Sequence, residues 1–282
     1  MTSLKLGMLA ALAWFAAAGA VYAQGGTPRA DEKMSTSQLL ASAEAGNVEA
    51  QYAAAVLLLF NGLPSVSELS QNPAKAEALA VRYLDAASLK NNAPAQYLLG
   101  TLYLSGRGVP ADVARAQALF LASADGGNTD AQNALGQILR KGQAGKRDDK
   151  AAVSWFTKAA EQGNMLALTN LGYMYSHGLG VAKNEEKAIE ITSRAAQAGV
   201  EEAQHNLGWM YQQGRGVPAS SAEAMTWYLR AAERGYAPSA LNAGFVYAKG
   251  EAGGDVRDQL VEAVKWFALA ATSRDEAIRE TA

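Results

Sequence analysis

The sequence predicts an all-α solenoid of about six αα-hairpins, and three observations lead to that prediction. First, helix-spaced apolar residues are followed by a glycine-containing turn and then by a second helix-spaced pattern. Second, the arrangement has a fixed period, because Ala95, Ala131, Ala167 and Ala203 are each 36 residues apart. Third, small residues stay in register through the repeats. A single hairpin cannot bury its apolar side alone, so stacked hairpins are expected to share a continuous core.

The clearest hairpin covers residues 203–232. Ala203 and Leu207 are spaced to share one side of a first helix. The segment GRGVP at residues 214–218 ends that helix, since glycine and proline favour turns. An apolar pattern that includes Trp227 then predicts the second helix.

Glycines inside the first helices keep the same period. They are Gly100, Gly136, Gly172, Gly208 and Gly244. Glycine inside a helix costs about 1 kcal/mol relative to alanine. Five such glycines in register therefore predict close backbone contact between helices, and the turn glycines are expected to supply positive φ at helix C-termini.

The N-terminal residues predict a signal for export. Residues 1–23 carry one charge, Lys5, before an apolar run, and small residues place the cleavage site near Ala23. A membrane-spanning helix is the alternative, but it needs about 20 apolar residues, more than this run provides. We therefore expect a periplasmic or secreted protein without a membrane span after processing. Residues 24–36 are polar and predict a flexible leader.

Residues 37–282 are assigned to the solenoid. Its repeats are expected to start near residues 50, 95, 131, 167, 203 and 239, with a longer loop around residues 63–72 in the first repeat. Residues 38–46 match the end of a second helix and predict an N-terminal cap. Residues 272–282 are polar on most sides and are predicted to extend the last helix as a solvent-facing cap.

Recurring strings also carry a resemblance to a known family. Residues 167–181 read ALTNLGYMYSHGLGV, residues 203–217 read AQHNLGWMYQQGRGV, and KAAEQG at residues 158–163 closes one unit. These strings resemble the Sel1-like repeat (SLR) family, which is related to tetratricopeptide repeats. The resemblance implies a right-handed superhelix that acts as a scaffold or adaptor, with no shared catalytic residues. For exported bacterial members it implies roles in envelope signalling, surface assembly or host interaction.

The chain departs from the family pattern at a few places. Leu139 replaces the usual tyrosine, Ile191 and Thr192 replace the Trp-aromatic pair, and residues 141–147 lack the Gly-Val turn. We expect these changes to weaken individual packing contacts without changing the fold.

The sequence offers no catalytic site, metal site or cofactor site. It contains no cysteine, and its two histidines, His177 and His205, belong to different repeats. The Ser-x-x-Lys motif of β-lactam-binding serine enzymes is missing. The formal charge of −2 is too balanced to favour nucleic acid. We predict a non-enzymatic, monomeric protein whose partner is a protein or peptide.

The candidate binding residues lie on the first helices. If the opening alanine is position 1, positions 1, 5 and 8 form the core stripe, and positions 3, 7 and 10 lie roughly opposite. First helices are expected to line the concave wall of the solenoid. The binding candidates at positions 3, 7 and 10 are Tyr97, Thr101, Gln137, Arg140, Thr169, Tyr173, His205, Trp209, Gln212 and Phe245.

Among these residues Tyr173, Trp209 and Phe245 form an aromatic ladder at position 7. Clustered aromatics are typical anchors for a bound peptide or helix. Two alternatives stay open at this point: the ladder packs neighbouring helices together, or it stacks on a glycan.

The function predicted from the sequence is an exported scaffold or adaptor that binds a peptide or protein on its concave face. One alternative is an enzyme that acts on cell-wall polymers or β-lactams, which would need a nucleophile or a carboxylate pair. A second alternative is a secreted virulence factor that binds a host protein.

Overall fold

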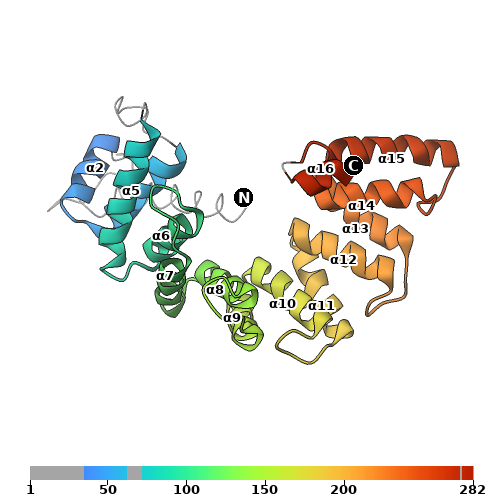
Figure 1. Ribbon diagram of the computed structural model, residues 1–282, viewed down its shortest axis with the longest axis horizontal. Helices are drawn as coiled ribbons and strands as arrows, with labels where there is room; N and C mark the ends of the chain where they lie inside the picture. Colours follow the sequence, from blue (N-terminus) through green and yellow to red (C-terminus); the bar gives the residue numbers. More distant parts are fainter. Residues whose placement is uncertain (1–34, 62–71, 274, 282) are drawn as a thin grey trace, which may run out of the picture. The chain divides into compact units, whose positions relative to one another are not determined.

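The computed structural model describes residues 35–61, 72–273 and 275–281. The chain divides into two compact units, Met1–Leu135 and Gly136–Ala282. The described residues form helices and turns without strands. Within each unit, consecutive helices pack in chain order as tandem hairpins, as the sequence predicted (Figure 1).

The helices are short and similar in length, most of them 13 residues. The first unit holds α2 (Thr36–Glu44), α3 (Val48–Val56), the π-helical turn η1 (Leu57–Asn61), α5 (Pro73–Ser88), α6 (Ala93–Ser105), α7 (Val113–Asp125) and the first half of α8 (Thr129–Lys141), up to Leu135. The second unit continues with α9 (Asp149–Glu161), α10 (Met165–His177), α11 (Glu185–Gln197), α12 (Glu201–Gln213), α13 (Ser221–Glu233), α14 (Ala237–Ala248), α15 (Val256–Ala270) and α16 (Glu276–Thr281).

Side chains and glycines fix the ends of these helices. Asn92 and Asn164 are N-caps whose side chains accept hydrogen bonds from backbone N–H groups three residues on, at 2.9 Å. Gly106, Gly178 and Gly214 end α6, α10 and α12 with φ of 69°, 66° and 66°. The predicted positive φ at the turn glycines is therefore confirmed.

In four hairpins the core includes a second-helix ring that packs against a first-helix glycine. A Cβ atom at Gly136 would lie 2.6 Å from the Phe156 ring, and one at Gly208 would lie 2.8 Å from the Tyr228 ring. Gly100 and Gly244 face the rings of Phe120 and Phe267 in the same way. The sequence predicted close backbone contact at these glycines, but the nearest neighbour is a second-helix ring.

The first helices also bond to the second helix that precedes them. Buried or nearly buried glutamines at position 2 donate Nε2–H to a carbonyl oxygen near the end of that helix, at 3.1–3.2 Å. They are Gln51, Gln96, Gln132 and Gln204. A first helix is thus packed on two sides, and less of its circumference stays free than in an isolated hairpin.

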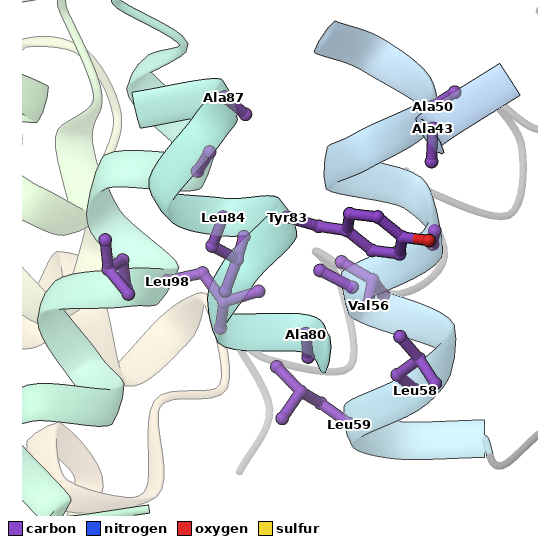
Figure 2. Packing of buried hydrophobic residues seen from close by; sticks show 14 of the residues in the cluster. Ala43, Ala50, Val56, Leu58, Leu59, Ala80, Tyr83, Leu84, Ala87 and Leu98 are labelled. Carbon is purple, nitrogen blue, oxygen red and sulfur yellow. The ribbon is translucent and has the colours of Figure 1, made fainter. Parts of the chain in front are cut away.

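The core of the first unit shows how one ring joins several helices (Figure 2). Tyr83 reaches from α5 toward α3, close to Val56, and is only 3% exposed. Its hydroxyl donates to the Glu44 carboxylate of α2 at 2.7 Å. Burial, together with this hydrogen bond, raises the pKa of Tyr83 to about 12.

The two ends of the solenoid differ in how well the sequence predicted them. The N-terminal cap is confirmed as α2, which begins at Thr36, the last residue assigned to the leader. The predicted signal (1–23), the rest of the leader up to residue 34, and residues 62–71 of the long loop lie outside the described residues. The C-terminal prediction is wrong, because α15 ends at Ala270 and α16 is a separate helix.

The break before α16 has a visible cause. The Thr272 hydroxyl donates to the Leu269 carbonyl at 2.7 Å, and Arg279 donates back to the Ser273 carbonyl at 3.0 Å. These side chains thus provide donors for backbone carbonyl oxygens at and just after the end of α15, so the helix need not continue. The turn lets Ile278 of α16 pack against a cluster of buried residues from α13, α14 and α15.

Candidate binding surface

Position 7 is the part of the first helices that stays accessible in the second unit. Tyr173 of α10 is 38% exposed and Phe245 of α14 is 39% exposed. Trp209 of α12 is half-buried, since one side packs against the core formed by α13 and α14. The predicted aromatic ladder is therefore partly available to a partner and partly used for packing.

A run of stacked side chains joins α10 to α12. The ring centroids of Tyr173 and His177 lie 4.0 Å apart, with 25° between the ring planes. Those of His177 and Trp209 lie 6.5 Å apart, with 15° between the planes. A guanidinium covers each end: Arg140 lies 5.2 Å from the Tyr173 centroid, and Arg215 lies 5.0 Å from the Trp209 centroid. We call these five residues the aromatic stack. Cations over ring faces hold such rings in place.

The sequence did not identify two members of this stack. His177 has no predicted role, because the two histidines belong to different repeats, and the structure places it as the last residue of α10. Its spacing of four residues from Tyr173 places the two rings on one face of the helix, which is a signal that the sequence did contain. Arg215 lies in the turn after α12, and only the fold brings it over Trp209.

The two arginines of the stack differ in their ion pairs. Arg215 lies 3.3 Å from the Glu185 carboxylate, which also pairs with Lys183 at 2.6 Å. The hydrogen bond from Lys183 lowers the pKa of Glu185 below its usual value. Arg140 has no carboxylate within 4.0 Å among the residues that the structure describes. One end of the stack thus carries a cation that a partner carboxylate could pair with.

A cavity of about 230 Å³ opens beside the stack. It is bounded by α10, α11 and α12, and its lining includes Gly172, Tyr173, Thr192, His205, Asn206 and Trp209. Thr192 is only 2% exposed and stands where other second helices carry a ring. The sequence identified this departure as a weakened packing contact, and the structure shows an open cavity there.

Position 3 does not face away from the core as the sequence predicted. Thr169 is 2% exposed, and its hydroxyl donates to the Met165 carbonyl at 2.9 Å. His205 lies between the rings of Tyr228 and Tyr236, 5.5 Å and 5.4 Å away. At His205 the expectation fails because the Tyr228 ring of the second helix packs against this side chain as well as against Gly208.

Burial also controls the charge of His205. Its Nδ1 lies 2.9 Å from the Ser239 hydroxyl. Desolvation lowers the pKa of His205 to about 4, so the imidazole is neutral at pH 7. It faces the cavity as a neutral, polar ring edge.

The remaining candidates are scattered. Tyr97 and Thr101 belong to the first unit, where Tyr97 packs 5.7 Å from Phe120 and burial raises its pKa to about 12. The Thr101 hydroxyl donates to the Tyr97 carbonyl at 3.0 Å. In the second unit Gln137 is half-buried, and the Gln212 Oε1 accepts a hydrogen bond from the Tyr228 hydroxyl at 2.9 Å. Arg140, Tyr173, His205 and Trp209 come together around the stack and the cavity.

The described residues contain no cluster of three or more His, Cys, Asp or Glu side chains able to hold a metal ion. Among the same residues, no helix has both the length and the apolar character required to cross a bilayer.

Comparisons with known proteins agree with this geometry. The model of the Sel1 repeat matches residues 48–92, 93–128, 129–164, 166–200, 201–236 and 237–275. A Sel1 repeat protein from Oxalobacter formigenes has a similar structure, with a TM-score of 0.75 and 23% identity over 86% of this chain and 92% of that chain. The predicted all-α solenoid is confirmed.

Two further structures are similar over much of the chain. One is c5321, a protective antigen present in uropathogenic Escherichia coli strains that displays an SLR fold, with 28% identity, a TM-score of 0.59 and coverage of 84% of this chain and 56% of that one. The other is the immunity protein Pa5087 from Pseudomonas aeruginosa, with 22% identity, a TM-score of 0.51 and coverage of 79% and 80%. A comparison with curated proteins gives no match.

Proposed function

Because the chain belongs to the Sel1 repeat family, whose members are generally protein-interaction scaffolds, we propose that it is an exported adaptor that binds a protein or peptide. The proposed binding surface is the face of α10, α12 and α14 that carries the aromatic stack and Phe245. The single observation that supports it most is the stack, in which the exposed ring of Tyr173 lies beside Arg140, an arginine without an ion pair in the part of the chain that the structure describes.

The chemistry of this surface fits a binding role. Tyr, Trp and Arg dominate the energetics of many interfaces. Tyr and Trp contribute much contact area with few rotamers, and Arg contributes several directional hydrogen-bond donors. Stacking holds Tyr173, His177 and Trp209 before a partner arrives, so little side-chain entropy is lost on association. Arg140 and Arg215 add positive charge, which favours a partner segment that contains carboxylates.

The binding role can be tested with a matched pair of tryptophans. Trp209 and Trp227 are both half-buried, and each has an arginine over its ring, at 5.0 Å and 4.6 Å. Only Trp209 lies on the proposed surface. A photoreactive residue at position 209, with position 227 as the control, identifies the partner in the native cell envelope. Titration of the purified protein with the identified partner then measures the dissociation constant.

Alanine variants follow from that titration. We expect Trp209→Ala and Tyr173→Ala to weaken the partner's affinity about 10-fold or more, which is about 1.4 kcal/mol. Trp227→Ala should change affinity less than about 2-fold, after correction for any unfolded fraction. Equal affinity for wild type, Trp209→Ala and Tyr173→Ala would rule out this surface.

Export is tested separately. Fractionation of cells that produce the full chain should place it outside the cytoplasm, with Gln24 as its first residue by mass spectrometry. A chain that keeps residues 1–23 and stays in the cytoplasm contradicts the proposal.

The same fractionation addresses a second candidate, a secreted protein that contacts a host. The likeness to a protective antigen of uropathogenic Escherichia coli favours that candidate. Recovery of the mature chain from the culture medium supports it, and retention in the periplasm supports the envelope adaptor.

A further inference from the structure

We propose that the cavity between α10, α11 and α12 binds an aromatic side chain of the partner, a tyrosine that is next to an acidic residue. This inference rests on the proposed function and specifies the partner. The partner's ring would occupy space that the second helix fills with its own ring in neighbouring hairpins.

The first argument is the register of the repeats. Phe120, Phe156, Thr192 and Tyr228 follow one another at intervals of 36 residues. The three rings are at most 1% exposed, and each lies on a first-helix glycine. Thr192 alone interrupts the series, so the α10/α11 hairpin lacks the ring that its neighbours contain.

The second argument is that the space has not been filled by other residues. The atom nearest to a Cβ atom at Gly172 would be the Thr192 Oγ1 at 2.5 Å, whereas the other four helix glycines have ring atoms in that place. Position 3 of the same helix is Thr169, another small residue. The resulting cavity of about 230 Å³ exceeds the roughly 150 Å³ of an engineered apolar cavity that binds benzene.

The third argument is the chemistry of the lining. The rings of Tyr173 and Trp209 offer aromatic contacts, for which ring centroids 4.5–7 Å apart are favourable. Thr192, Asn206 and the neutral imidazole of His205 provide hydrogen-bonding groups. A phenol has both a ring and a hydroxyl, so it matches this mixed lining better than a phenyl group.

The fourth argument is charge. Arg140 lies over the ring of Tyr173, which lines the cavity, and has no ion pair among the described residues. A carboxylate next to the partner's tyrosine could accept its guanidinium hydrogens, and Arg–carboxylate pairs are strong and directional. This argument selects an acidic neighbour for the tyrosine.

The test uses p-cresol, which is the tyrosine side chain from Cβ outward, and the purified full-length protein. We expect p-cresol to bind the wild type with a dissociation constant of about 1 mM or below, as measured by calorimetry. Thr192→Phe should reduce this affinity at least about 10-fold, because the new ring occupies the cavity. Thr226→Phe is the matched control, since Thr226 is exposed on α13 and its ring would stay outside the cavity.

Each outcome decides the proposal. Loss of p-cresol binding in Thr192→Phe but not in Thr226→Phe supports it, provided that Thr192→Phe melts at the wild-type temperature or above. If Thr192→Phe does not fold, Thr192→Leu fills part of the cavity and takes its place. No binding by the wild type, or equal binding by the filled variants, overturns the proposal.

The partner assay separates this proposal from the proposed function. If Trp209→Ala lowers the affinity for the partner and Thr192→Phe does not, the proposed surface is correct and the cavity is not used. If neither variant lowers that affinity, both proposals fail.

Discussion

The α10/α11 and α12/α13 hairpins are built alike but filled differently. All four helices have 13 residues, and the two first helices end at glycines with the same φ of 66°. The α12/α13 hairpin packs Tyr228 against Gly208 and His205, whereas the α10/α11 hairpin has Thr192 against Gly172. The comparison teaches that the glycines and turns define the hairpin, while the ring fills it. Removing the ring leaves a cavity, not a different fold.

The largest expected effect comes from making the filled hairpin resemble the open one. Tyr228→Thr removes a fully buried ring and leaves Gln212 without its hydroxyl donor. We expect a loss of about 3–5 kcal/mol in the free energy of unfolding, typical of ring deletion in a core. Urea denaturation measures it, and Thr226→Ala on the exposed face of α13 is the control. A loss below about 1 kcal/mol would mean that the ring is not needed in either hairpin.

The second effect is a pH dependence that only the filled hairpin has. His205 is buried between two tyrosines, and its pKa is about 4 in the folded protein against 6.5 as its ordinary value. Between those two values the unfolded chain binds a proton that the folded chain does not, so stability falls as pH decreases from about 6.5 to about 4. A shift of this size corresponds to a loss on the order of 3 kcal/mol.

The measurement is the difference between wild type and His205→Gln in melting experiments at pH 7 and pH 4.5. Carboxylates titrate in the same range, but they are common to both proteins and cancel in the difference. Wild type should lose more stability than the variant on acidification. A parallel decrease in both proteins contradicts the assignment to His205.

The two helix glycines provide a sharper form of the comparison. A Cβ atom at Gly208 would lie 2.8 Å from the Tyr228 ring and 3.1 Å from the Ala224 carbonyl oxygen. Gly208→Ala should therefore destabilise by about 1–3 kcal/mol through overpacking. In Gly172→Ala the Cβ atom would lie 2.5 Å from the Thr192 Oγ1, so Thr192 must turn to another χ1 rotamer. That change moves one side-chain atom instead of a ring, and the variant gains up to about 1 kcal/mol of helix propensity, so we expect a smaller loss of stability than in Gly208→Ala. Equal effects in denaturation experiments would show that the ring does not decide the packing.

The sequence predicted the fold because period and spacing are repeated several times. Each 36-residue step carries its own alanines, glycines and turn, so the prediction does not depend on one position. The C-terminal helix was predicted wrongly because it occurs once. Its break depends on bonds of Thr272 and Arg279 that no repeat displays.

The candidate site was less predictable, for a geometric reason. The helical wheel assigned one buried stripe to each first helix, but these helices pack against second helices on two sides. Thr169 is consequently buried, and Tyr173 stays accessible. The stack depends on Arg215, which reaches Trp209 from a turn. A contact between residues on different elements is decided by the fold, and spacing along one helix cannot reveal it.

The smallest expected effect on stability comes from two arginine–aromatic contacts, of which only one lies on the proposed binding surface. Arg140 lies 5.2 Å from Tyr173 on the proposed surface, and Arg230 lies 4.6 Å from Trp227 on α13. Exposed contacts of this kind contribute about 0.5–1 kcal/mol, so Arg140→Gln and Arg230→Gln should lower stability by similar, small amounts. Their effects on the affinity for an acidic partner should differ, because only Arg140 lies on the proposed binding surface. We expect Arg140→Gln to lower the affinity for the partner several-fold and to reduce the salt dependence of that affinity, while Arg230→Gln leaves both quantities unchanged. Titrations at two ionic strengths measure both quantities, and equal binding by the two variants would remove charge from the recognition mechanism.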